Sequence, residues 1–191
     1  MIDFKKLVKI KWKEIREKTI ISYPEIEDLC YRSYPNHKKG CPNIDKCYHL
    51  NIPNFEIISE YGKYNHFYLI YAKFDFKQYK KLRKKEHSNW SEKQVKCVLY
   101  WQKSVKKLLS EFINLLILTK QNNYILGCGS GLNINFQKRV GSMENSNINV
   151  FSTCKLNNIK LEINPENVIY LVCLLCTKKP ITFKKQKQLT L

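Results

Sequence analysis

Three cysteines and a histidine fall within eighteen residues near the N-terminus, in the segment from Cys30 to Cys47. Pro35, Gly40 and Pro42 interrupt this segment, and a proline inside a helix removes a hydrogen bond and clashes with the preceding turn. The segment therefore cannot form a long helix, and we expect a loop whose turns bring distant side chains together. Because thiolates are soft donors, a loop with several cysteines suits zinc or an iron–sulfur cluster.

The cysteines of this loop, Cys30, Cys41 and Cys47, are one short of the four thiolates that complete such a site. A fourth ligand must therefore come from another part of the chain. His37 and His49 lie close enough in sequence to be alternative ligands, although a histidine beside lysines is also a normal solvated side chain. The other interpretation is that the cysteines are ordinary thiols, because cysteine also packs as a small apolar residue.

The length of 191 residues suits one domain with its own hydrophobic core. We expect this domain over residues 1–177 and a basic tail over 178–191. The N-terminal residues are rich in lysine and lack the apolar stretch of a signal peptide. The longest apolar run, Val168 to Cys176, has about half the length of a membrane-spanning helix. These features predict a cytoplasmic protein without a membrane segment, in which cysteines bind metal or stay free rather than form disulfides.

The formal net charge is +18, from 34 lysines and arginines against 16 aspartates and glutamates. An excess of this size favours contact with nucleic acid or another polyanion. The lysines are spread along a chain that is also rich in Asn and Ile, which is the composition that an AT-rich genome would give. The charge therefore leaves two explanations open, a nucleic-acid-binding surface or codon usage.

Apolar spacing predicts an α/β or α+β fold in which helices cover a small sheet. Helices are expected over residues 2–19, 76–87 and 91–120, with a shorter one near 149–156. The third of them begins at Ser91, which forms a capping box with Gln94. The second is strongly basic, which indicates either a solvated face or a phosphate-binding surface.

Four segments are predicted to form the strands of the sheet: residues 66–76, 124–128, 159–163 and 168–176. The last is apolar throughout, so we expect it at the centre of the sheet. It contains Cys173 and Cys176, which are three positions apart and should point to opposite faces.

Cys128 is the best candidate for the fourth ligand. It ends the strand predicted from Tyr124 and precedes the glycine-rich turn from Gly129 to Gly131, where its side chain can face a metal centre. This turn lacks the Gly-Lys-Ser/Thr ending of a phosphate-binding loop. The remaining cysteines fall within predicted helices or the apolar strand: Cys97, Cys154, Cys173 and Cys176.

Two blocks of the sequence resemble a prokaryotic family of cysteine-rich predicted metal-binding proteins of unknown function. The first contains Cys30, Gly40-Cys41-Pro42 and Cys47, and is similar to the N-terminal cysteine cluster of that family. The second runs from Gly141-Ser142-Met143-Glu144-Asn145 to Val150-Phe151, and resembles its Ser-Met-Glu motif with the helix that follows.

The resemblance implies a small α/β protein that binds a metal centre, most readily an iron–sulfur cluster. Within it, Cys128 falls where a second group of cysteines would begin. The chain departs from the family because the other cysteines of that group are absent between Asn133 and Gln137. In addition, Cys47 is followed by Tyr48 and His49 rather than by two prolines. One centre with four ligands is therefore the expectation.

We thus expect a metal-binding protein with a redox or regulatory role, in which Cys30, Cys41, Cys47 and Cys128 hold one centre. By their number, four thiolates suit a 4Fe-4S cluster or a tetrahedral zinc ion equally well, and the resemblance favours the cluster. A redox role would require a partner protein. The alternative is a basic nucleic-acid-binding module with a structural zinc site. An enzyme with a reactive thiol is a third hypothesis, although no Cys–His–Asp pattern or pair of carboxylates in the sequence supports it.

Overall fold

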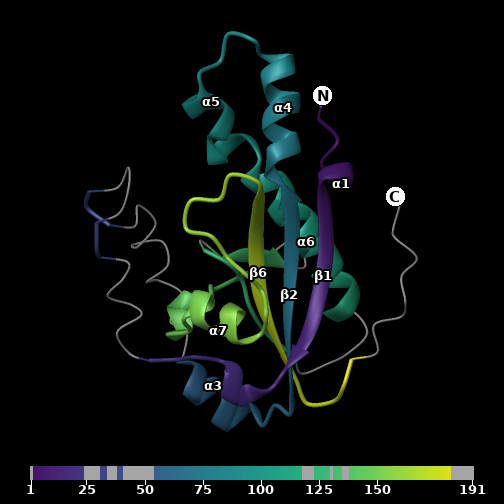
Figure 1. The fold of residues 1–191 in the computed structure, drawn as a ribbon. Coiled ribbons are helices and arrows are strands. Elements are labelled where there is room, and N and C mark those ends of the chain that lie inside the picture. Colours follow the sequence, from purple (N-terminus) through teal and green to yellow (C-terminus); the bar gives the residue numbers. More distant parts are fainter. Residues whose placement is uncertain are drawn as a thin grey trace.

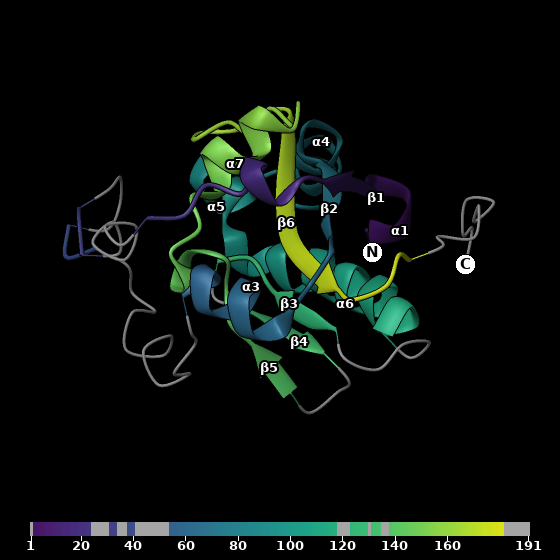
Figure 2. The same cartoon turned by 90° about the horizontal axis from the view of Figure 1, so that it is seen from below.

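The computed structural model describes residues 2–23, 31–33, 38–40, 54–117, 123–129, 131–134 and 138–181. Within these residues, an open antiparallel sheet of four strands has the order β1-β2-β6-β3. Helices lie on both of its faces (Figures 1 and 2). The fold is therefore α+β, in agreement with the predicted class. No helix in this part of the chain is both long enough and apolar enough to cross a membrane.

The strands of the structure are β1 (Val8–Ile15), β2 (His66–Asp75), β3 (Tyr124–Leu126), β4 (Leu132–Ile134), β5 (Lys138–Val140) and β6 (Val168–Thr177). β2 and β6 pair over their whole lengths at the centre of the sheet, so the central position predicted for β6 is confirmed. β3 pairs only with Leu174–Cys176, at the C-terminal end of β6. β4 and β5 form a separate two-stranded ribbon.

The α-helices are α1 (Phe4–Leu7), α3 (Phe55–Gly62), α4 (Phe76–Glu86), α5 (Glu92–Lys96), α6 (Gln102–Ile117) and α7 (Val150–Leu156). The predicted basic helix is confirmed as α4, and the predicted short helix near residue 150 as α7. The capping box of Ser91 and Gln94 is also present, at the start of α5.

The helix predicted over residues 2–19 is wrong, because only its first turn, α1, is α-helical, and strand β1 and the 3-10 turn η1 (Glu17–Thr19) follow. Val8, Ile10 and Trp12 alternate with lysines, and this period of two residues is that of a strand. The strand predicted over residues 159–163 is wrong as well, since this segment is irregular and its Ile163 is 82% exposed. β1 supplies the remaining strand of the sheet instead, at the edge beside β2.

The helix predicted over residues 91–120 is interrupted between α5 and α6. Cys97 has a ψ of 126°, and the 3-10 turn η3 (Val98–Tyr100) follows it. Trp101 follows this turn, and its indole is buried in the core, where it stacks on the ring of Phe74 with 5.4 Å between ring centroids. The break lets α5 lie beside α4, where Lys96 of α5 reaches Glu166.

The sheet separates two hydrophobic cores. On one face, here called the α6 face, Ile70 and Cys173 pack with residues of α6 such as Leu109. On the opposite face, called the α7 face, Cys176 packs with Cys154 of α7 and with residues of α3. Cys173 and Cys176 therefore point to opposite faces, as predicted. Figure 2 shows α6 and α7 on the two sides of the central strands.

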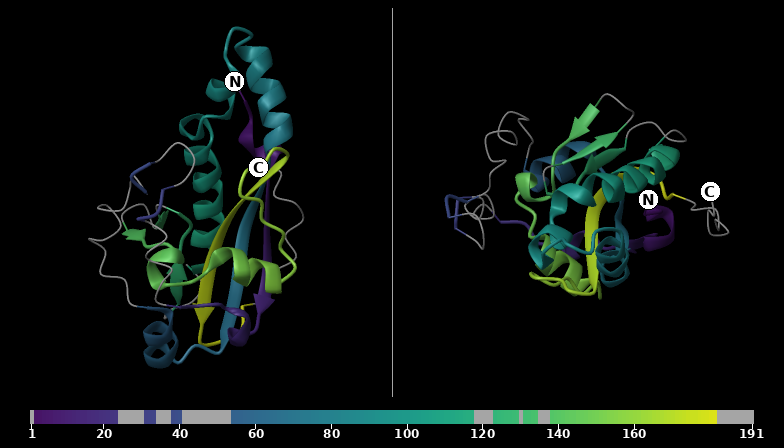
Figure 3. Two further views of the ribbon diagram at one scale, coloured as in Figure 1. Left: turned by 60° about the vertical axis from the view of Figure 1, so that its left-hand side comes forward. Right: turned by 90° about the horizontal axis from the view of Figure 1, so that it is seen from above.

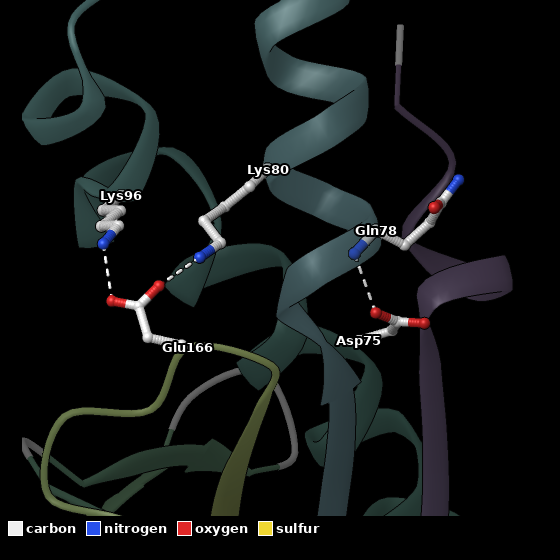
Figure 4. A network of polar contacts seen from close by, with 5 residues as sticks. All are labelled: Asp75, Gln78, Lys80, Lys96 and Glu166. Carbon is white, nitrogen blue, oxygen red and sulfur yellow. Dashed lines mark hydrogen bonds and ion pairs between the residues drawn. The ribbon is translucent and has the colours of Figure 1, made fainter.

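The pair of helices α4 and α5 projects beyond the end of the sheet (Figures 1 and 3). The segment before β6 is tied to this projection by Glu166, which accepts hydrogen bonds from Lys80 of α4 and Lys96 of α5 (Figure 4). The Lys96 Nζ atom lies 2.6 Å from the carboxylate. Of the predicted basic tail, the structure describes residues up to Ile181, whose backbone N–H donates to the Tyr68 hydroxyl at 3.1 Å.

The first prediction concerns the cap of α5. The Ser91 hydroxyl accepts from the Gln94 N–H at 3.3 Å, and the Gln94 side chain accepts from the Ser91 N–H at 2.8 Å. Ser91→Ala should lower the free energy of unfolding by about 1 kcal/mol, because it leaves the Gln94 N–H without its acceptor. Urea unfolding measures the effect, with Ser88→Ala in the preceding turn as the control. An unchanged midpoint for Ser91→Ala would contradict the assignment.

The second prediction concerns the ion pairs of Glu166. Hydrogen bonds from Lys80 and Lys96 lower the pKa of Glu166 from 4.5 to about 2. The ion pairs therefore stabilise the fold at pH values above the ordinary pKa of the carboxyl group. This contribution is lost as the pH falls towards about 2. Glu166→Gln should be less stable than the wild type near neutral pH and equally stable in strong acid. Thermal unfolding measured against pH checks this prediction. For the control variant Glu162→Gln, the stability difference from the wild type should not show this disappearance in acid.

Candidate metal centre

Most of the candidate ligands lie outside the described residues: Cys30, His37, Cys41, Cys47 and His49. Their role therefore stays a prediction. Cys128 lies inside, and the structure places it two residues after the last residue of β3, near the predicted strand end. Among the residues that the structure describes, no group of three or more His, Cys, Asp and Glu side chains is arranged to hold a metal ion. A metal centre at Cys128 would need ligands from the remainder of the chain.

The turn after Cys128 has a backbone that favours glycine. Gly129 and Gly131 have φ angles of +53° and +83°, in the left-handed region that side chains with a Cβ rarely adopt. At Gly127, a Cβ atom would lie 2.9 Å from the Cβ atom of Leu132. The glycines on both sides of Cys128 thus allow the chain to turn sharply and to approach β4 closely.

The Ser-Met-Glu block lies directly beside Cys128. The Gly127 N–H donates to the Gly141 carbonyl at 2.6 Å, and the Gly127 carbonyl accepts from the Met143 N–H at 3.1 Å. Met143 is fully buried in the core of the α7 face and holds the block in place. Glu144, the next residue, is thereby brought close to Cys128, and the two side chains interact electrostatically.

The Cys128 thiol is buried next to a second thiol and a lysine. A hydrogen bond from Cys173 of β6 is the largest cause that lowers the pKa of Cys128, and the Lys106 ammonium lowers it further. Burial and the Glu144 carboxylate act in the opposite direction. The pKa of Cys173 is raised well above its usual value, because this thiol interacts with Cys128 and is buried. Cys128 is therefore the thiol of the pair whose pKa is lowered, and Cys173 is its hydrogen-bond donor.

Other buried cysteines lack this environment. Burial raises the pKa of Cys154 to about 12, and it raises the pKa of Cys176 as well. Only a thiolate is an effective nucleophile or metal ligand, so these two thiols are chemically inert by comparison. Cys128 is thus chemically distinct from the cysteines packed in the α7 face.

The carboxyl group of Glu144 is buried, although the residue as a whole is half-buried. Burial raises the pKa of Glu144, while hydrogen bonds from its own N–H, the Ser142 hydroxyl and the Gly129 N–H favour the carboxylate. Its Oε2 atom is buried and, within the described part of the chain, accepts no hydrogen bond. A buried acceptor without a partner is destabilising, so this oxygen is suited to a cation or a hydrogen-bond donor.

Cys128 and Glu144 both line a cavity of about 180 Å³. The opposite wall is Val168–Val172 of β6, the part of that strand that does not pair with β3. The first turn of α7 and the segment around Leu161 complete the lining. A larger cleft, of about 720 Å³, lies elsewhere and is lined by residues of β1 and the end of α7, with no cysteine. The smaller cavity is the candidate site, because a thiol and a carboxyl group with perturbed pKa values meet there.

The sequence singled out Cys128 as a candidate but not the groups around it. Glu144 stands in the block that carries the resemblance, yet nothing in the sequence connected it with Cys128. Cys173 was expected to diverge from Cys176, which is correct, but its contact with Cys128 arises across the core of the α6 face. Lys106 gave no signal at all among so many lysines.

Comparison of the chain with protein-family models, with curated proteins and with solved structures finds no match. The site must therefore be interpreted from its own geometry and chemistry.

The third prediction concerns the thiol pair in the metal-free protein. Cys173→Ala should raise the pKa of Cys128, because it removes the hydrogen bond that most stabilises the thiolate. The ultraviolet absorbance of the thiolate, followed against pH, measures this shift. Cys128→Ser should abolish the first thiolate step, whereas Cys154→Ser should preserve it. A first step that persists in Cys128→Ser would show that another cysteine is the acidic one.

Proposed function

We propose that this chain is a metal-binding protein in which Cys128 joins Cys30, Cys41 and Cys47 in one centre with a redox or regulatory role. The observation that carries the proposal is the environment of Cys128, a buried thiol at a strand end that is biased towards the thiolate. Thiolate formation is what binding of a soft metal requires. The cavity at this thiol gives a ligand or a metal ion space beside it.

The attachment of the N-terminal segment also supports the proposal. The Tyr23 N–H donates to the Asn147 carbonyl at 3.1 Å, so the described chain reaches the block that contains Glu144. The 3-10 turn η4 (Glu144–Ser146) joins this contact to the cavity beside Cys128. From Tyr23, the seven residues to Cys30 can extend over about 25 Å. The described chain is thus in contact with this block seven residues before Cys30.

Two kinds of centre fit four thiolates. A 4Fe-4S cluster would supply one-electron transfer, and a zinc ion would tie the N-terminal segment to the sheet. We favour the cluster because of the resemblance of the two sequence blocks. In either case, Lys106 would offset part of the negative charge of the ligands, and Cys173 would donate a hydrogen bond to the Cys128 sulfur.

The fourth prediction is the metal content of cysteine variants. In protein expressed and purified anaerobically, Cys41→Ser and Cys128→Ser should each lose most of the iron or zinc per chain. Cys97→Ser should keep it, because Cys97 lies at the end of α5, among residues that do not line the cavity. Elemental analysis, sulfide determination and visible absorbance measure the outcome. Iron with equal sulfide selects the cluster, and a colourless protein with one zinc selects the structural site.

Two controls make this result decisive. Circular dichroism of Cys128→Ser separates loss of a ligand from loss of the fold. Iron or zinc added back to the folded Cys128→Ser variant should remain poorly bound, whereas wild-type protein should regain its content. Wild-type protein that purifies anaerobically with neither metal, and that binds neither on reconstitution, would contradict the proposed function.

A further inference from the structure

Within the residues that the structure describes, helices cover the α7 face of the sheet over one half. α3 and α7 pack where this face carries Leu69, Leu174 and Cys176. Towards the other end of the strands, no helix lies in front of β1 and β2 in Figure 1. Here five side chains form what we call the lysine–tyrosine surface: Lys9, Lys11, Tyr71, Lys73 and Tyr170. Lys9 and Lys11 are exposed, and the other three are half-buried at the border of the core.

The strand register places these side chains next to one another on one face. Lys9 lies directly opposite Lys73, and Lys11 lies directly opposite Tyr71. Lys73 in turn lies opposite Tyr170 of β6. The Cβ atoms of directly opposite residues in antiparallel strands are about 5 Å apart and their side chains share a face. The surface is therefore continuous across β1, β2 and β6.

The three lysines concentrate positive charge without compensation. None of them forms an ion pair within the described chain. The nearest carboxylate along β2 on this face, that of Asp75, is occupied as the N-cap of α4, where it accepts from the Gln78 N–H at 2.8 Å (Figure 4). Like charges directly opposite each other, as at Lys9 and Lys73, destabilise paired strands. An anion bound between them would relieve this repulsion.

The aromatic rings of the two tyrosines lie beside these charges. The rings of Tyr71 and Tyr170 are 5.9 Å apart between centroids, with an angle of 58° between their planes. Proteins bind single-stranded nucleic acid by stacking its bases on aromatic side chains of a sheet, while basic residues contact its phosphates. Stacking on the tyrosines distinguishes single-stranded nucleic acid from a simple polyanion, which would contact the lysines alone.

We propose that the lysine–tyrosine surface binds single-stranded nucleic acid, with bases stacked on the two tyrosines and phosphates held by the three lysines. The basic helix α4 is less suited to this role than its sequence indicates. Its Lys80 is paired with Glu166, and its Arg83 is paired with Glu86. The surface adjoins the candidate site at Tyr170, which also lines the cavity beside Cys128, whereas its three lysines lie on β1 and β2 and do not line that cavity.

The test uses a fluorescently labelled oligothymidylate, titrated with the full-length protein at several salt concentrations. The double variant Lys9→Gln/Lys73→Gln should lose about tenfold in affinity at low salt. The slope of log K against log salt should also fall by about 1.4, the value for two phosphate contacts on a single strand. The matched control, Lys81→Gln/Lys85→Gln, removes the same charge from exposed positions of α4 and should change the affinity less than about threefold.

A second double variant tests stacking. Tyr71→Leu/Tyr170→Leu should weaken binding by about tenfold or more with little change in the salt slope, because it removes aromatic faces and no charge. Thermal unfolding confirms that each variant is folded. Equal losses for the two lysine pairs, an unaffected tyrosine variant, or wild-type protein that does not bind the oligonucleotide at low salt would each overturn the proposal.

Discussion

The pairing of β2 with β6 is the interaction on which the rest of this structure depends. The two strands pair along ten residues each and are covered over much of both faces, so they divide the interior into two cores. Both proposed sites are positioned by this pair of strands. β6 brings Cys173 to Cys128 on one face, and its unpaired edge forms a wall of the adjacent cavity. β2 and β6 together carry the two tyrosines on the other face. A register shift of one residue would exchange the two faces and destroy both arrangements.

The sequence predicted the helices and strands in which the spacing of apolar residues is unambiguous. It failed where the same segment fits both a helical and a strand spacing. β2 and β6 are long apolar runs, and α4 and α7 have clear boundaries, so their positions were predictable. In the segment of β1, the apolar residues Phe4, Leu7 and Val8 suit a helix, whereas Val8, Ile10 and Trp12 suit a strand. Pairing with β2 decides between these periods, and that is a tertiary effect. The break before α6 is also a tertiary effect, because it lets α5 lie beside α4.

The candidate site was predictable only in part, for a related reason. Cys128 could be chosen because a strand end and a glycine-rich turn are local signals. The groups that set its chemistry come from α6, from β6 and from the block at Glu144, far away in sequence. The isolated bridge between Gly127 and Ser142 brings the last of these, the block at Glu144, to Cys128. The roles of Cys30, Cys41 and Cys47 rest on composition and on resemblance, and remain predictions outside the described residues.

The central claim is that the Cys128 sulfur is a ligand of a metal centre shared with the N-terminal cysteines. Protection from alkylation tests it most directly. Protein purified anaerobically is alkylated with its metal in place and again after chelation, and mass spectrometry identifies the modified cysteines. Our account predicts that Cys30, Cys41, Cys47 and Cys128 become modified together, only after the metal is removed, while Cys97 reacts equally in both states. Alkylation of Cys128 at the same rate with and without bound metal would contradict it.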